Sequence, residues 1–287
     1  MPRRALIFVL ALASAALPAM SSAYEIKPKT PETGFSGKLR PDILGISTDS
    51  TADSARTAFE ASFKGRSDSK TDVQQQKFGG TAIGYIAALN FSVPSGAKQT
   101  GEMIWSNFSS PASANRSYFI ARNITFAQDQ QPAKADMIKE VMDKYGSPTI
   151  VGDQHLYYIY RKGSIVSAGA KYKDTAAIDA IDKPLDPRIA VKLNGETVRG
   201  SCVAVVKRSQ VKEKTLSAML DEAKGANCDG VLSVQLVPGT TPDRVGLAQF
   251  TILDLKRIIS AAAIDTEALA AEQNERNPVP KGSAPKL

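Results

Sequence analysis

The chain of 287 residues is poor in the side chains that most often perform chemistry. It contains one histidine, His155, and two cysteines. A single histidine excludes a His-rich zinc site, and neither a Gly-rich phosphate loop nor a carboxylate cluster with metal-ligand spacing occurs in the sequence. No motif for catalysis, metal binding or nucleotide binding stands out, so no cofactor is expected.

Long apolar runs are also missing, except at the N-terminus. Arg3 and Arg4 precede an uncharged apolar stretch from Ala5 to Ala19, and small residues follow up to Ala23. This order predicts a signal peptide over residues 1–23 with cleavage between Ala23 and Tyr24. A membrane anchor is the alternative, but spanning needs about 20 apolar residues and this run has about 15.

The sequence after the predicted cleavage site offers neither a lipid attachment site nor a membrane-spanning segment. No cysteine lies near the cleavage site to carry a lipid, and no later segment is long and apolar enough to span a membrane. We therefore expect a soluble protein that is not lipid-anchored, in a bacterial periplasm or secreted.

The number and distribution of charged residues indicate whether nucleic acid is an expected partner. The formal net charge of +7 falls to +5 without Arg3 and Arg4, and the remaining basic residues are interleaved with Asp and Glu. Nucleic-acid binding usually needs a clustered basic face, so nucleic acid is not expected as a partner. With 43% hydrophobic and 23% charged residues, the chain has the composition of a folded globular protein.

Hydrophobic periodicity organises the first half of the chain. Residues 24–40 form an extended lead-in, and ordered structure is expected from Pro41. Alternating segments separated by Pro, Gly and Ser predict an antiparallel meander, and apolar stripes at helical spacing predict two helices. The expected strands are Asp42–Ile46, Ile83–Val93, Gly101–Ser109, Ser117–Ala127 and Gln154–Arg161, and the expected helices are Thr51–Phe63 and Pro132–Tyr145.

The second half repeats these elements in another order. Strands are expected at Gly200–Lys207, Gly230–Val237 and Val245–Leu255, and helices at Val211–Lys224 and up to about Asn274. Periodicity is weak from Lys162 to Asp186, which fits a domain boundary or a long hairpin. The predicted fold class is α+β, an antiparallel sheet flanked by short helices in two packed lobes, 41–165 and 187–274, followed by a disordered tail over 275–287.

Cys202 and Cys228 are expected to form a disulfide, because an isolated pair in an oxidising compartment is usually bonded. Each cysteine lies at the start of a predicted strand, so a parallel crossover would bring both to one end of a sheet. Antiparallel pairing would separate them by roughly 20 Å, too far for a disulfide.

Asparagine recurs in the first half with a defined spacing. Asn90, Asn107, Asn115 and Asn123 each begin an Asn-x-Ser/Thr triplet. In a eukaryotic protein they would be glycan acceptors. Several lie within predicted strands, where a glycan would obstruct packing, so we interpret them as a sheet surface rich in Ser, Thr and Asn.

Two short segments carry a family resemblance. Ile43-Leu44-Gly45-Ile46, followed by Ser/Thr residues and the helix around 55–59, resembles exported bacterial modules of the outer-membrane small protein A and beta-lactamase-inhibitor-protein type. Lys144-Tyr145-Gly146-Ser147-Pro148 is similar to a helix ending in the same modules. The resemblance implies an α+β scaffold that binds other proteins, although this chain lacks the lipid-bearing cysteine of the lipoprotein branch.

These observations favour a non-catalytic periplasmic binding or envelope-associated module whose ligand or envelope-protein partner is unknown. His155, Tyr157 and Arg161 share one strand face and carry side chains typical of interfaces, so they are the predicted partner contacts. The alternative is an exported enzyme of unrecognised type, with a site assembled from scattered Ser, Asp, Glu and Lys residues.

Overall fold

The computed structural model describes residues 25–36, 40–186, 191–193, 196–198, 201–209 and 215–277. The predicted signal peptide, its cleavage between Ala23 and Tyr24, and most of the 275–287 tail lie outside the described residues.

The first part of the chain, up to residue 165, has one helix followed by a run of four strands, and then helical elements followed by three shorter strands. In chain order they are α1 (Ala52–Ser62), β1 (Lys70–Lys77), β2 (Gly84–Val93), β3 (Gly101–Phe108), β4 (Ser117–Thr125), the 3₁₀ helix η2 (Gln128–Gln130), α2 (Lys134–Tyr145), β5 (Ile150–Val151), β6 (His155–Arg161) and β7 (Ser164–Ile165).

The second part of the chain supplies the remaining elements. They are β8 (Ala170–Lys171), α3 (Thr175–Ile181), β9 (Val191–Leu193), β10 (Glu196–Val198), α4 (Ser201–Ser209), α5 (Leu216–Gly225), β11 (Gly230–Pro238), β12 (Val245–Leu253) and α6 (Leu255–Arg276). Among the described residues, no helix combines the length and apolar character needed to cross a bilayer.

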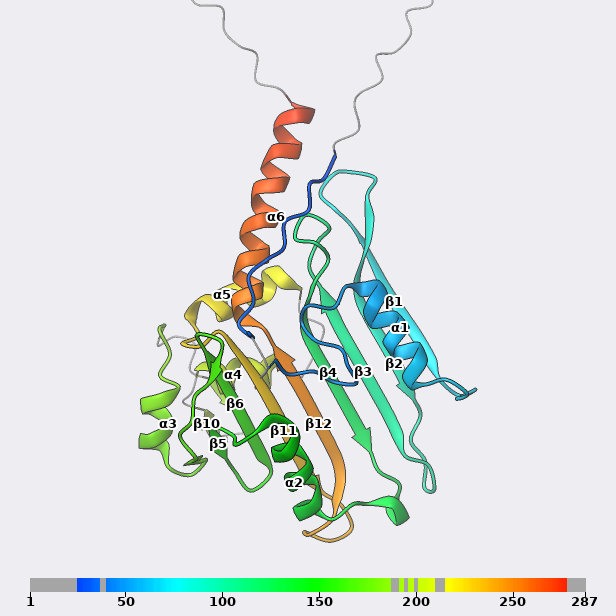
Figure 1. The fold of residues 1–287 in the computed structure, drawn as a ribbon, viewed down its shortest axis with the longest axis vertical. Coiled ribbons are helices and arrows are strands. Elements are labelled where there is room, and N and C mark those ends of the chain that lie inside the picture. The colour runs from blue at the N-terminus through cyan, green and yellow to red at the C-terminus, as the bar shows by residue number, and fades with distance from the viewer. Residues whose placement is uncertain are drawn as a thin grey trace, which may run out of the picture.

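Ten of the described strands form one sheet in the order β1-β2-β3-β4-β12-β11-β6-β5-β8, with β7 paired to β6 (Figure 1). All neighbouring pairs are antiparallel except β5 with β8, which confirms the predicted α+β class. The hairpin β11–β12 lies between β4 and β6. Strands from both expected lobes therefore belong to one continuous sheet.

Each face of the sheet packs against its own set of helices. On the first face, Leu89, Ile104 and Ile120 belong to a core that also contains Phe59 of α1 and Val141 of α2. These two helices lie in front of the sheet in Figure 1. Both helices match the sequence prediction, and α1 begins at Thr51, whose side chain accepts a hydrogen bond from the Ser54 amide.

On the second face, a separate core joins the sheet to α4, α5 and the first turn of α6. Phe119, Tyr157 and Leu253 contribute from the sheet, with Val205 of α4 and Met219 of α5 packed over them. The long helix α6 continues beyond this core (Figure 1), and its later residues Leu269 and Arg276 approach Gly79 and Gly80 in the turn between β1 and β2.

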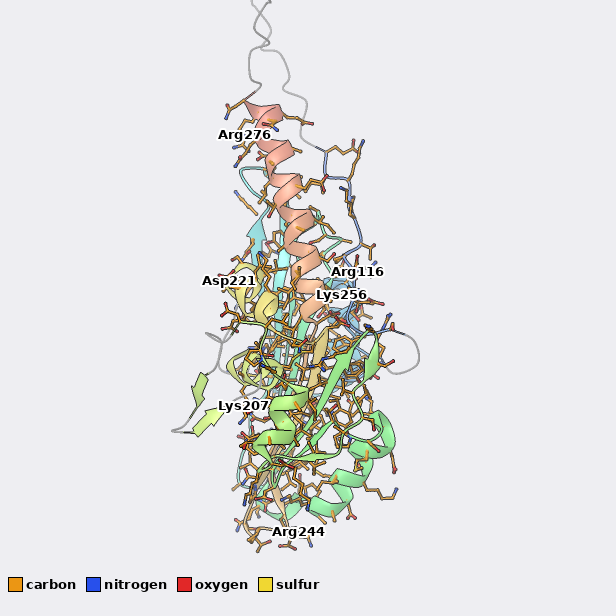
Figure 2. All side chains as sticks on the ribbon, turned by 90° about the vertical axis from the view of Figure 1, so that its left-hand side faces the viewer. Arg116, Lys207, Asp221, Arg244, Lys256 and Arg276 are labelled. Atoms are coloured by element: carbon orange, nitrogen blue, oxygen red, sulfur yellow. A yellow bond between two sulfur atoms is a disulfide. The ribbon has the colours of Figure 1, made fainter. Side chains whose placement is uncertain are left out.

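The lead-in is docked onto the fold, so the expectation that order begins at Pro41 is wrong. Phe35 is completely buried, and its ring meets that of Tyr160 edge-on with centroids 4.7 Å apart. Glu32 forms an ion pair of 2.9 Å with Lys256, which Figure 2 labels near the base of α6. The buried ring of Phe35 explains why the lead-in docks, because one aromatic side chain buries a large apolar area even though the residues around it are mostly polar.

Asp254 fastens this lead-in to α6 through a cluster of hydrogen bonds. Its carboxylate accepts from the Thr33 hydroxyl (2.6 Å), the Gly34 amide (2.9 Å), the Thr48 hydroxyl (2.9 Å) and the Arg257 amide (3.0 Å). The last of these is the N-cap bond of α6. Asp254 is fully buried and the Arg257 side chain is 1% exposed, so the two charges compensate each other inside the protein.

Two predicted strands are absent at their expected places. Residues Asp42–Ile46 form a tight turn, in which Leu44 and Gly45 have φ angles of 54° and 78° and Ile43 pairs with Ile46. Most of the predicted strand Gly200–Lys207 belongs instead to helix α4. The apolar run Cys202–Val206 is buried between the sheet and α5, and an apolar run of this length fits a buried strand as well as a buried helix.

The Cys202–Cys228 disulfide is confirmed, with an S–S distance of 2.06 Å and Cα atoms 6.4 Å apart. The parallel crossover proposed to explain it is wrong, because Cys202 lies in the first turn of α4 and Cys228 precedes β11. Asp182 stabilises that turn by accepting from the amides of Cys202 (2.8 Å) and Val203 (3.1 Å). Burial raises the pKa of Asp182 to about 6, although these hydrogen bonds oppose the shift.

Candidate ligand-binding site

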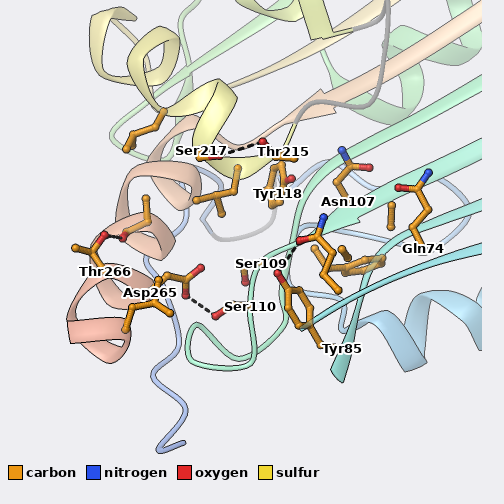
Figure 3. Close-up of a pocket in the computed structure, with 18 residues that line it drawn as sticks. Gln74, Tyr85, Asn107, Ser109, Ser110, Tyr118, Thr215, Ser217, Asp265 and Thr266 are labelled. Atoms are coloured by element: carbon orange, nitrogen blue, oxygen red, sulfur yellow. Dashed lines mark hydrogen bonds between the residues drawn. The ribbon is translucent and has the colours of Figure 1, made fainter. Parts of the chain in front are cut away.

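A cavity of about 530 Å³ lies between the second face of the sheet and helices α5 and α6 (Figure 3). Among the described residues that line it, the polar groups are uncharged except for the carboxyl group of Asp265. The polar lining residues are Gln74, Gln76, Tyr85, Asn107, Ser109, Ser110, Tyr118, Thr215, Ser217, Asp265 and Thr266. A volume of this size suits a small organic ligand.

Asp265 of α6 is held by the loop between β3 and β4. Its carboxylate accepts from the hydroxyls of Ser110 (2.7 Å) and Ser113 (2.6 Å). Burial raises the pKa of Asp265, and these two hydrogen bonds oppose that change. Because both serines are already bonded to it, the carboxylate is fixed in position at the wall of the cavity (Figure 3).

The loop that carries these serines is itself fixed by Asn115. This residue adopts a left-handed conformation with φ of 47°, as does Ala114 with φ of 61°. The Asn115 side chain donates to the carbonyls of Ser109 (2.8 Å) and Ile86 (3.0 Å). Asparagine tolerates this conformation better than most residues, so the sequence explains the turn that presents Ser110 and Ser113.

Two tyrosines complete the wall formed by the sheet. The Tyr85 hydroxyl donates to the Gln76 side-chain carbonyl at 3.1 Å. Burial raises the pKa of Tyr85, and the nearby charge of Asp265 adds to the shift. Burial also raises the pKa of Tyr118, which is 2% exposed. Both phenols therefore stay protonated and can act as neutral hydrogen-bonding groups.

Beyond the cavity, the second face carries a row of side chains that cross six neighbouring strands. We call this the cross-strand row; each member is the register partner of the next. Its members, from β2 to β6, are Ser92, Met103, Asn123, Gln249, Gln235 and His155. All are half-buried except Met103, which is 36% exposed, so the side chains of the row are partly accessible to solvent.

Asn90 and Trp105 connect this row to the cavity. They are register partners on β2 and β3 and lie two residues along each strand from Ser92 and Met103. Two residues further, Ala88 pairs with Asn107, and both line the cavity. Successive same-face residues thus lead from the cavity, past the half-buried Trp105, to the cross-strand row.

His155 ends the row beside a group of aromatic rings. Its imidazole is stacked on Tyr157 and Tyr172, with centroids 5.7 Å and 6.1 Å away. Burial, and then the positive charge of Lys207, lower the pKa of His155 to about 4, although a hydrogen bond with Gln235 opposes the shift. His155 is therefore neutral at physiological pH.

The other predicted partner contacts do not lie on an open surface, and this part of the prediction needs correction. Tyr157 is completely buried in the second-face core. Arg161 donates through Nε to the Asn227 carbonyl at 2.6 Å and also bonds the Ile181 carbonyl. Helices α3 and α4 cover this end of the strand, so of the three residues only His155 reaches the cross-strand row.

Sequence reasoning missed Asp265, Ser110 and the glutamines of the site, because nothing in their local sequence distinguishes them. The asparagine triplets were the usable signal, since Asn90, Asn107 and Asn123 all lie on the second face. Within the described part of the chain, no three His, Cys, Asp or Glu side chains gather as metal ligands would.

Comparison with known proteins gave no relative: no family model, no curated protein and no solved structure matches the chain.

Proposed function

We propose that the protein is a non-catalytic binding module that works outside the cytoplasm, in the periplasm or at the envelope of a bacterium. It holds a polar, uncharged ligand in the cavity between the sheet and helices α5 and α6. The observation that carries this proposal is the lining of that cavity, whose described residues offer many neutral hydrogen-bonding groups around the fixed carboxylate of Asp265.

Two features support a location outside the cytoplasm. The N-terminal sequence has the order of a signal peptide. The Cys202–Cys228 disulfide fits an oxidising compartment, since cytosolic thiols are usually kept reduced.

Binding is favoured over catalysis because the cavity lacks a convincing nucleophile and base. Both serines donate to Asp265, and neither Lys nor His is among the described residues lining the cavity. A serine nucleophile normally needs such a base to accept its proton.

The second candidate is an exported enzyme that uses the Ser110–Asp265–Ser113 group, in which two hydroxyls and a carboxylate converge at the wall of the cavity. A serine-reactive fluorophosphonate probe separates the two functions. The binding proposal expects no labelling of Ser110 or Ser113. Stoichiometric labelling that disappears in the Asp265→Asn variant would establish the enzyme instead.

The ligand can be sought directly by native mass spectrometry of protein isolated from the periplasm. We expect a non-covalent adduct on the wild type. Ala88→Phe places a ring in the cavity and should abolish the adduct, whereas Ala61→Phe, on the exposed side of α1, should retain it. The proposal fails if the wild type carries no adduct and a periplasmic small-molecule extract does not raise its melting temperature.

A further inference from the structure

We infer that the cross-strand row binds an extended, uncharged glycan chain that continues from the cavity across the second face of the sheet. The inference rests on the proposed function, because it assigns a ligand class to the same face. The juxtaposition that carries it is the in-register alignment of Asn123, Gln249 and Gln235 on three adjacent strands, β4, β12 and β11.

The chemistry of these side chains matches a sugar. Each amide offers an NH₂ donor and a carbonyl acceptor side by side. A sugar hydroxyl also donates and accepts, so neighbouring hydroxyls can bond both ends of one amide. Aligned amides on adjacent strands repeat this arrangement at the strand spacing of about 4.8 Å, which is close to the repeat of an extended chain of six-membered sugar rings.

The row is uncharged along its length. Ser92, Met103, Asn123, Gln249 and Gln235 do not ionise, and His155 is neutral because its pKa is lowered to about 4. Among the described residues, a lysine flanks each end of the row: Lys70 pairs with Ser92 at the β1 edge, and Lys207 lies 2.9 Å from the Tyr172 hydroxyl beyond His155. Figure 2 labels Lys207 in this region. A neutral polymer loses no ionic hydration at these side chains, whereas an anionic one would find no positive charge among the members of the row.

Aromatic groups lie where a sugar ring could use its apolar face. Trp105 is half-buried next to Met103, between the row and the cavity, and His155 is stacked with Tyr172 at the other end. Aromatic side chains combine a flat apolar surface with a low entropic cost of ordering. From β2 to β6 the row crosses five strand spacings, about 24 Å in all, enough for about five sugar units.

Trp105 is the only tryptophan of the chain, so its fluorescence reports on this surface. The full mature protein should be titrated with neutral hexasaccharides of β-1,4-linked glucose and of β-1,4-linked N-acetylglucosamine, and with hexagalacturonate as an anionic counterpart. We expect saturable binding of at least one neutral hexamer, weaker binding of its disaccharide, and none of hexagalacturonate.

The double variant Asn123→Ala/Gln249→Ala should bind the neutral hexamer about tenfold more weakly, because two hydrogen-bonding groups are lost. The matched control is Gln273→Ala/Asn274→Ala, which removes the same residue types from an exposed part of α6 and should bind like the wild type. Circular dichroism checks folding. If the double variant does not fold, each single variant should bind about threefold more weakly.

The two proposals fail in different ways. If the wild type carries a cavity adduct but neither neutral hexamer binds by fluorescence or calorimetry, the glycan assignment is wrong and the binding module stands. If neither adduct nor hexamer binding is found, both are wrong. A dimer in sedimentation that dissociates in Asn123→Ala/Gln249→Ala would show that a second copy covers the row, and would also overturn the glycan assignment.

Discussion

Replacing Asp254 with alanine removes the carboxylate that joins the lead-in, the Thr48 loop and the start of α6. The lost N-cap bond to the Arg257 amide costs about 1 kcal/mol, and the hydroxyl bonds of Thr33 and Thr48 cost about 1 kcal/mol each. Arg257, 1% exposed, keeps only its ion pair with the half-exposed Asp49. Breaking a buried charge pair costs about 3–5 kcal/mol. Since these contributions overlap, we expect a total loss of about 4–5 kcal/mol.

The assay is thermal unfolding followed by circular dichroism, supported by urea titration. A domain of this size loses about 2–4 °C of melting temperature for each kcal/mol, so Asp254→Ala should unfold about 10–15 °C below the wild type. The control Asp243→Ala, on an exposed loop, should stay within about 0.5 kcal/mol. Asp254→Ala/Arg257→Ala should cost less than the sum of its single variants, because it leaves no uncompensated charge. A loss below about 1.5 kcal/mol for Asp254→Ala would refute the reasoning.

Three further predictions concern the disulfide, the histidine and the N-terminus. Cys202→Ala/Cys228→Ala should lower the free energy of unfolding by about 3.5 kcal/mol, the loop-closure value for a sequence separation of 26; an unchanged urea midpoint would contradict this. The single imidazole resonance of His155 should titrate near pH 4 in the folded protein. Because this pKa is depressed, the stability that the neutral imidazole contributes is present above about pH 6.5 and is lost as the pH falls towards 4. The variant His155→Gln should therefore show a flatter dependence of the free energy of unfolding on pH in this range. An NMR titration midpoint near 6.5 would show that the imidazole is solvated and would contradict the prediction. Exported protein should begin at Tyr24 by intact mass, and retention of Met1 would exclude cleavage.

The sequence predicted those elements in which apolar and polar positions contrast at a regular spacing or whose ends carry turn residues. Helix α2 shows the contrast, and strands β2, β3 and β4 are separated by turns rich in Pro, Gly and Ser, although β4 is buried on both faces. Each was found within a few residues of its expected bounds. The prediction failed where that contrast disappears. Helix α4 begins with a short buried apolar run, Cys202–Val206, which fits a strand equally well, and β1 is an edge strand with mostly polar side chains on both faces.

The candidate site was less accessible to prediction than the fold. His155 and three of the four asparagines lie on the second face, as do Tyr157 and Arg161. The prediction of Tyr157 and Arg161 as partner contacts failed because the helices that cover them come from later parts of the chain. The alignment of Asn123 with Gln249 and Gln235 depends on β12 and β11 lying beside β4. Sheet order of this kind is fixed by long-range packing, which local periodicity does not record.

The position of the β11–β12 hairpin also sets the order in which the protein can fold. These strands are made last, yet they lie between β4 and β6, so the centre of the sheet cannot form until residue 253 has left the ribosome. Until then β4 and β6 each keep an unpaired edge that can pair with other chains. Contacts between such distant segments slow folding. Chains cut short before Leu253 should therefore aggregate rather than yield a smaller folded unit.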